Sequence, residues 1–534
     1  MKKNRLSRLF GGLCLVSVLL IFPLTVALSM VILLSPCSSQ AASPAATTTA
    51  AQPQTGGIYK VTQRAVTNLF GYPPRMAGTA RDSAPPFFDR LLRVGDDGKY
   101  KPELALSWDT SADGKAITFK LKQGVTFHDG TPFNAQAVKA NLDNLIPPKA
   151  TILSGIASID VVDDYTVKLN LSAYNNLILH HFAANPATHM YSPEALKKNG
   201  ADWANTHPVG TGPFMLKDYQ PNISLKLVKN PNYWQKGLPY LDGIEINQVS
   251  DPMTQMMSFK AGQVNAIYEA DATATVQLRG EGYPVMSAPG SLIGINFDTK
   301  NSKIFSKPQV RQAIEYAIDK EAVCSGPGQG LYTPVYQILP DTSPDYNPAC
   351  PPRKYDPARA KKLLAEAGYP NGFSFKMFIL DSVWRDGWVA IQNYLDAVGI
   401  KMEVNYVSVS AYNLMRMGGK IEQGGAGYHS YPTSSNTLFT LDAYWRTNAP
   451  IWQYVAKPTG IDELIDQAKL SRDPAAITKI NQQVVKLIYD DATIVPVWVN
   501  PRIAIVDKSV QNPGWFIYGD PDNNELGRRT WLKK

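Results

Sequence analysis

Residues 102–142 read PELALSWDTSADGKAITFKLKQGVTFHDGTPFNAQAVKANL, and this stretch decides the fold class. After the turn dipeptide Asp113-Gly114, apolar and polar residues alternate from 117 to 122, which predicts a half-buried strand. A second turn at Asp129-Gly130 precedes Asn134, which can cap a helix whose apolar residues recur at helical spacing. The stretch therefore predicts a strand, a turn and a helix in one unit.

Strands and helices are mixed along the rest of the chain without strict alternation. Alternating apolar residues predict a strand at 167–171, whereas Asp356-Pro357 and Asp473-Pro474 each predict the start of a helix. No repeat of about 20 to 50 residues is visible. The 534 residues predict three or four structural units at about 150 residues per domain. The predicted fold class is α/β or mixed α+β with more than one sheet.

The same stretch resembles the signature of the extracellular solute-binding proteins of the peptide and nickel uptake family, which serve ABC importers. The resemblance rests on residues 102–105, 107–108, 113–114, 119 and 124–133, and on later stretches at 207–214, 230–234, 310–319 and 355–370. It spans residues 56–534 and implies a periplasmic-binding-protein-like fold, in which two lobes are joined by hinge strands.

The resemblance also implies an extra domain in the first lobe. We predict that lobe I is discontinuous and combines 56–98, 209–294 and 495–534, that the extra domain is 99–208, and that lobe II is 295–494. Residues 1–41 are predicted to be an export signal, and 42–55 a flexible tether rich in Ala, Ser, Thr, Pro and Gln.

The N-terminus is organised like an export signal, with basic residues, an apolar run at 13–34 and a small-residue tail. A permanent membrane span is the alternative, because the run is long enough to cross a bilayer. Residues 34–37, Leu-Ser-Pro-Cys, resemble a bacterial lipobox, which makes Cys37 the predicted lipid anchor. Pro36 departs from that pattern, and cleavage after Ala41 is the alternative. We expect an exported protein in the cell envelope, outside the cytoplasmic membrane.

The formal net charge of +8 does not indicate a nucleic-acid partner, because four of the basic residues lie in the acid-free leader and the others are scattered. Beyond the leader only Cys324 and Cys350 occur. They can close one disulfide in an oxidising compartment, and two free buried thiols are the alternative.

The main catalytic templates are missing from the sequence. There is no G-x-S-x-G, P-loop, H-E-x-x-H or C-x-x-C motif, so we predict no catalytic residue and no cofactor. His180, His181 and His189 have no acidic or cysteine partner at ligand spacing, so no metal site is predicted. A secreted hydrolase whose separated carboxylates meet in the fold is the alternative.

Residues 427–432, Gly-Tyr-His-Ser-Tyr-Pro, bear most directly on the cargo. In peptide-binding relatives the matching stretch carries an aspartate that pairs with the free ammonium group of the peptide. Ser430 stands there and supplies no charge, which disfavours ordinary free-amine peptides because a buried ammonium needs an anionic partner. His429 can meet a nickel chelate, as resemblance to nickel-binding members allows, and a neutral histidine is the alternative.

Several further side chains are candidates for binding the solute. Arg75 and Arg81, in an irregular loop at 72–86, are predicted to meet anionic groups of the cargo, and a plain surface connection is the alternative. The C-terminal half, which includes Trp498, is rich in aromatic rings that suit planar or sugar-like cargo. Packing in the hydrophobic core is the alternative role of these rings. The predicted ligand-binding residues are Tyr72, Arg75, Arg81, Asn296, Trp384, Trp388, Tyr428, His429, Ser430, Tyr431 and Trp445.

Together these observations predict a non-catalytic, monomeric receptor. It captures a small solute, peptide-like or other, between two lobes and delivers it to the permease and ATPase of an ABC importer. A signalling or chaperone-like relative that keeps the fold without transport is a further alternative.

Overall fold

The computed structural model describes residues 52–66, 68–76, 83–95, 97–146, 153–381, 383–433, 436–514 and 525–534. The predicted export signal, Cys37 and Arg81 lie outside these residues. Residues 53–534 form one compact unit. Within the described ranges, none of the helices has the length and apolar character that crossing a bilayer requires.

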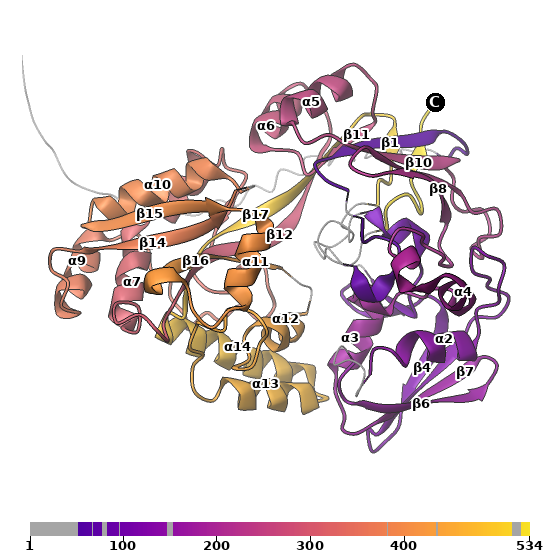
Figure 1. Cartoon of the computed structure of the whole chain (residues 1–534), viewed down its shortest axis with the longest axis horizontal. Helices are drawn as coiled ribbons and strands as arrows, with labels where there is room; N and C mark the ends of the chain where they lie inside the picture. The colour runs from indigo at the N-terminus through magenta and orange to yellow at the C-terminus, as the bar shows by residue number, and fades with distance from the viewer. Residues whose placement is uncertain are drawn as a thin grey trace, which may run out of the picture. The chain divides into compact units, whose positions relative to one another are not determined.

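One eleven-stranded sheet runs through this unit, with β12 and β17 at its centre (Figure 1). Its first half is β11 (Ala266–Tyr268), β1 (Ile58–Gln63), β10 (Gly243–Gln248), β9 (Ser224–Lys229) and β8 (Phe214–Gln220). Its second half is β16 (Ala426–Pro432), β14 (Phe373–Leu380) and β15 (Ile400–Val407), and β13 (Thr333–Pro334) pairs with β17.

The two long central strands, β12 (Val285–Phe297) and β17 (Ile494–Val506), connect these halves. At its start, β12 pairs with the part of β17 that also carries β11, and Met286 lies opposite Ala504. At its end, β12 pairs with β16, and Phe297 lies opposite Ala426. The register of β12 against β17 shifts between Pro289 and Leu292, so the ladder is irregular midway between the two halves.

A separate four-stranded antiparallel sheet contains the strand predicted from the opening stretch. Its order is β4 (Ala105–Thr110), β5 (Ala116–Leu121), β7 (Thr166–Leu171) and β6 (Ile156–Asp163). In β5 the apolar residues are buried in alternation with more exposed polar ones. α2 (Ala135–Leu142) begins at Asn134, whose side chain accepts a hydrogen bond from the Ala137 amide at 3.0 Å. The predicted strand, turn and helix are confirmed.

The remaining elements cover the sheets or connect them. Beside the first half of the large sheet and the small sheet lie β2 (Leu92–Val94), β3 (Tyr100–Pro102), α3 (Leu177–Ala184), α4 (Pro193–Ala204), α5 (Pro252–Lys260), α6 (Ala272–Gly280), β18 (Val510–Gln511) and β19 (Trp531–Leu532). With the second half lie α7 (Pro308–Ala317), α8 (Lys320–Ser325), α9 (Pro357–Glu366), α10 (Arg385–Asp396), α11 (Val409–Met417), α12 (Thr437–Tyr444), α13 (Ile461–Leu470) and α14 (Pro474–Asp491). The short 3-10 turns are Pro73–Arg75, Pro85–Phe87, Pro186–Thr188 and Glu422–Gly424. Asp356 and Asp473 cap α9 and α14, as predicted.

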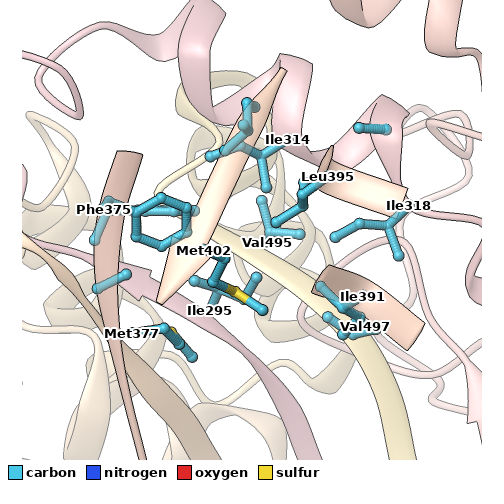
Figure 2. Packing of buried hydrophobic residues seen from close by; sticks show 14 of the residues in the cluster. Ile295, Ile314, Ile318, Phe375, Met377, Ile391, Leu395, Met402, Val495 and Val497 are labelled. Carbon is cyan, nitrogen blue, oxygen red and sulfur yellow. The ribbon is translucent and has the colours of Figure 1, made fainter. Parts of the chain in front are cut away.

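The second half of the sheet has a hydrophobic core on each face. Figure 2 shows one of them, in which Ile295 and Val495 from the sheet pack with Ile314 of α7 and Leu395 of α10. The other core lies between the sheet and the helices α12, α13 and α14. The predicted mixed α/β fold class is confirmed by this arrangement of sheets and covering helices.

The expected disulfide between Cys324 and Cys350 does not form, and both cysteines are free, buried thiols. The reason is packing. Cys324 belongs to the core shown in Figure 2, whereas Cys350 belongs to the core against α12, α13 and α14.

Candidate functional site

The carboxyl ends of two sets of parallel strands point towards the middle of the β12–β17 pair. β1 is parallel to β10 and β11, and β14 is parallel to β15 and β16. β11 ends with Tyr268 opposite Ala504, and β16 approaches from the other side, so that Pro432 lies opposite Ser291. Ligands of open α/β sheets bind outside the carboxyl ends of the strands. The register therefore selects this middle region as the candidate site.

Five aromatic residues from several segments meet in this region. Trp498 lies on β17, Tyr428 on β16 and Trp388 on α10, while Trp384 precedes α10 and Tyr332 precedes β13. The Tyr332 and Trp384 rings stack, with centroids 4.2 Å apart and planes at 15°. Trp384 lies 5.0 Å from Trp498, and Trp388 lies 5.4 Å from Trp498 and 6.0 Å from Tyr428. We call these five residues the aromatic site.

The aromatic site has a buried floor and a partly exposed rim. Trp388, Tyr428 and Trp498 are buried and belong to the core of Figure 2. Tyr332 and Trp384 are half-buried and pack against it. Structural core packing explains the floor, whereas the rim offers aromatic surface that a solute can contact.

Two polar residues flank the rim. Ser430, on β16, is half-buried and lies on the same face of the strand as Tyr428. Arg64 directly follows β1 and is also half-buried, and its Nε is buried without a hydrogen-bond partner among the described residues. Burial raises the pKa of Tyr332 to about 12, although the nearby positive charge of Arg64 opposes this rise and the Asp271 carboxylate adds to it. Tyr332 is therefore a neutral hydrogen-bond donor at physiological pH, within electrostatic reach of Arg64.

A cavity of about 190 Å³ also lies against the middle of the β12–β17 pair. Its lining includes Ser287, Pro289, Thr333, Asp341, Val499 and Pro501. A larger hollow of about 630 Å³ lies on the outside of the second half, beside α7, α9 and α14. Arg353 in that hollow pairs with Glu315 at 2.9 Å and stacks on Tyr489, so its charge already has a partner within the protein.

β16 separates the predicted binding residues into two groups, because successive side chains of a strand point to opposite faces. Tyr428 packs against Trp388 in the core of Figure 2, at the aromatic site. His429 lies on the other face, with its ring 4.2 Å from Trp452 and 5.0 Å from Tyr431.

His429, Tyr431 and Trp445 are buried in the layer under α12, α13 and α14. Neither ring nitrogen of His429 has a hydrogen-bond partner among the described residues, and burial holds its pKa well below the ordinary value. His429 is thus a neutral, enclosed histidine. The Tyr431 hydroxyl donates to the carbonyl oxygen of Ile338. The sheet places all three away from the aromatic site.

The remaining predicted residues lie elsewhere. Arg75 is paired with Asp202 at 2.7 Å on the surface, and its side chain is 46% exposed. Tyr72 packs edge-on against Tyr191 and lines a pocket of about 210 Å³ beside α2 and α4. Asn296 is buried on β12, and neither the nitrogen nor the oxygen of its side-chain amide has a hydrogen-bond partner among the described residues.

Sequence reasoning missed Arg64 and Tyr332 and did not select Trp498 for the site. The signal for Arg64 was its place immediately after a strand, where ligand-binding groups gather in open sheets. Among the described residues, no group of three or more His, Cys, Asp and Glu side chains is arranged to hold a metal ion.

Comparison with known proteins matches residues 99–449 to the family described as bacterial extracellular solute-binding proteins, family 5 Middle. The chain is 31% identical over 457 residues to the glutathione-binding protein GsiB of Shigella flexneri, which covers 81% of this chain and 87% of that protein. The chain belongs to solute-binding protein family 5.

Solved structures of this family 5 fold are also similar to the chain. DppA from Helicobacter pylori, in complex with the peptide STSA, matches with a TM-score of 0.79 and 23% identity over 90% of this chain and 99% of that chain. AgaA from A. tumefaciens R10, in complex with agropinic acid, matches with a TM-score of 0.75 and 28% identity over 89% of this chain and 99% of that chain. The predicted family, the two-lobed fold and the role as the solute-binding component of an ABC importer are confirmed. The family also makes it an exported protein that works with a membrane permease and ATPase.

Proposed function

We propose that this family 5 protein binds its solute at the aromatic site, between two lobes that close over it without chemical change to the solute. The observation that carries the proposal is the convergence of both sets of strand ends on one aromatic cluster with a buried floor and a half-buried rim. A solute held there contacts groups from both halves of the sheet. Since those contacts are complete only when the halves are close, binding shifts the population towards the closed state.

The proposed lobes follow the sheet. Lobe I combines 56–98, 209–294 and 495–534, the extra domain is 99–208, and lobe II is 295–494. The order of the large sheet and the separate sheet of β4–β7 support this division. β12 and β17 act as hinge strands, and the irregular register near Pro289 supports bending at that point.

Contacts between the extra domain and lobe II support a movable interface. The Asn176 side chain donates to the Ala468 carbonyl oxygen at 2.8 Å, and Arg472 donates to that of Ala112 at 3.2 Å. Apolar contacts accompany them, because Leu177 belongs to the core against α12, α13 and α14 and the His180 ring lies 4.9 Å from that of Phe439. Opening of the lobes therefore separates both polar and apolar contacts.

The proposed cargo is a small peptide-like or carboxylated solute. GsiB binds glutathione and AgaA was solved with agropinic acid, which supports this class for a family member. Ser430 supplies no charge for a free ammonium group, so we propose that the site does not depend on one. Nickel chelates are less well supported, because His429 is enclosed on the other face of β16.

The test measures thermal stabilisation by glutathione, short peptides and agropinic acid, together with mass spectrometry of each solute after incubation. We expect at least one of them to raise the melting temperature and to be recovered intact. Trp384→Ala should abolish the shift, whereas Trp203→Ala, which removes a partly exposed tryptophan on α4, should leave it unchanged. Unchanged stabilisation of Trp384→Ala would exclude the aromatic site, and conversion of the solute would favour the secreted hydrolase.

We also propose that the protein is a monomer anchored by lipid at Cys37 after removal of the export signal. Mass spectrometry of the N-terminal peptide from membrane fractions tests this anchor, and Cys37→Ser should release the protein. Cleavage after Ala41 in the native protein would contradict the anchor.

A further inference from the structure

Arg64 is an arginine whose guanidinium group the fold leaves without an acid. Two other arginines, both buried in the fold, have such a partner: Arg311 pairs with Asp491 at 2.9 Å, and Arg528 pairs with Asp89 at 2.8 Å. The Nε of Arg64 is buried, yet it makes no hydrogen bond to the residues that the structure describes. A buried donor of a charged group is costly to leave unpaired. This cost is recovered when a ligand supplies the acceptor.

The surroundings of Arg64 favour an acceptor that comes from outside the protein. Asp271 is the nearby acid that shares Tyr332 as an electrostatic neighbour. Its carboxylate caps α6, however, by accepting a hydrogen bond from the Ala274 amide at 2.7 Å. This carboxylate is therefore engaged at the start of its own helix, and no ion pair joins it to Arg64 within the described residues.

Tyr332 offers a second hydrogen-bond donor near Arg64. The Tyr332 hydroxyl feels the charge of Arg64, and burial keeps this hydroxyl protonated. The Tyr332 ring is held in place by its stack on Trp384, with centroids 4.2 Å apart. A guanidinium group that follows β1 and a neutral phenol that precedes β13 are thus electrostatic neighbours beside the aromatic site.

We propose that Arg64 binds a carboxylate of the transported solute, with Tyr332 as a second hydrogen-bond donor to it. The inference rests on the proposed function and adds the residues that recognise the carboxylate, in a small solute whose planar or apolar part contacts Trp384. Arg64 belongs to lobe I and Tyr332 to lobe II, so one carboxylate bridges the lobes and favours closure. Arg64 also sets the specificity, because cationic or amidated solutes leave its charge unpaired.

The experiment offers the purified protein a mixture of short peptides and small organic acids together with their C-terminal or carboxyl amides. Native mass spectrometry identifies the retained solutes, and titration calorimetry measures their affinities. We expect the wild-type protein to retain acids over their amides. Arg64→Met should weaken acid binding by about 10- to 100-fold, the size of a hydrogen bond to a charged group, and should remove the preference for acids. Arg64→Lys keeps the charge but loses the planar fork of the guanidinium group, so its affinity for acids should lie between those of the wild type and Arg64→Met.

Two controls separate this inference from folding defects and from the proposed site. Without solute, Arg64→Met should be as stable as the wild type or more stable, because an apolar side chain replaces a half-buried cation whose Nε has no partner among the described residues. Arg75→Met, which breaks the surface pair with Asp202, should bind acids normally. Trp384→Ala should lose acids and amides alike, because it removes the aromatic contact that both share.

The outcomes are distinguishable. If Arg64→Met binds acids like the wild type, or if the wild type retains amides as well as acids, the inference about Arg64 is overturned while the aromatic site stands. If Trp384→Ala keeps full affinity while Arg64→Met loses it, the aromatic site is wrong and the role of Arg64 holds.

Discussion

Arg528 ties the C-terminal segment to two earlier segments that contain Asp89 and Glu103, and its replacement should be strongly destabilising. Its Nη1 donates to Glu103 at 2.5 Å and its Nη2 donates to Asp89 at 2.8 Å. The side chain of Arg528 is only 9% exposed, and those of Asp89 and Glu103 are 0% and 3% exposed. Arg528→Met therefore leaves two carboxylates in a place that water does not reach.

The size of the destabilisation follows from the hydrogen bonds that each carboxylate keeps when Arg528 is replaced. Asp89 retains hydrogen bonds from Thr211, Tyr233 and Trp234, whereas Glu103 retains one from the Arg90 amide. Breaking a buried ion pair by removing one partner costs about 3–5 kcal/mol, most of which we assign to Glu103.

The cost should depend on pH, because burial already raises the pKa of Glu103 in the native protein. Loss of Arg528 raises this pKa further, so Glu103 of the folded variant takes up a proton more readily than the unfolded chain does. The destabilisation is then complete at high pH and diminishes as the pH falls through the raised pKa towards the unfolded value.

Urea denaturation followed by tryptophan fluorescence at pH 8 and pH 5 measures both effects. Arg528→Met should lose about 3–5 kcal/mol at pH 8 and less at pH 5. Lys354→Met is the control, because Lys354 and Glu321 are 66% and 57% exposed and such a pair contributes about 1 kcal/mol or less. The reasoning is refuted if both variants lose the same free energy, or if the gap between Arg528→Met and the wild type does not change with pH.

Three further predictions concern other buried groups. Burial lowers the pKa of Lys457 to about 7, so from that pH upward the unfolded chain binds a proton that the folded protein does not. The free energy of unfolding should rise by up to about 1.4 kcal/mol per pH unit between pH 7 and pH 9, and Lys457→Met should flatten this rise in urea titrations. Burial raises the pKa of Cys324 to about 12 and of Cys350 to about 11, so both thiols should resist alkylation in the folded protein. In urea without reductant both should react, and peptide mass spectrometry can measure this. A disulfide between them would block alkylation in urea and contradict the prediction. Gly294→Ala places a Cβ 2.5 Å from the Val495 carbonyl oxygen and should cost about 1–3 kcal/mol in urea denaturation, whereas Gly280→Ala, with open space around it, should be close to neutral.

The local elements could be predicted because their causes lie within a few residues of each other. The alternation in β5 and the capping side chains of Asn134 and Asp356 act over one strand or one helical turn. The joining of the lobes could not be predicted in this way. Val285 pairs with Ile505, and such a pairing depends on the packing of the whole sheet rather than on any local pattern.

In the candidate site, too, neighbours in the sequence could be predicted, whereas their places in the fold were not. Tyr428, His429, Ser430 and Tyr431 were predicted together because they are adjacent in the sequence. Successive side chains of β16 point to opposite faces, so Tyr428 lies at the aromatic site and His429 lies under α12. This separation could have been predicted once 426–432 was recognised as a strand.

The two arginines Arg75 and Arg64 show what no local pattern could supply. Composition favoured Arg75, which lies in an irregular loop, yet the fold provides its partner, Asp202, from a position 127 residues away. Arg64 follows a plain strand, yet the fold provides its Nε with no acceptor among the described residues. Whether an arginine is available to a solute is decided by the acids that tertiary structure brings to it. This availability, rather than the loop in which a residue lies, is the reason that Arg64 is the stronger candidate for binding an anionic solute.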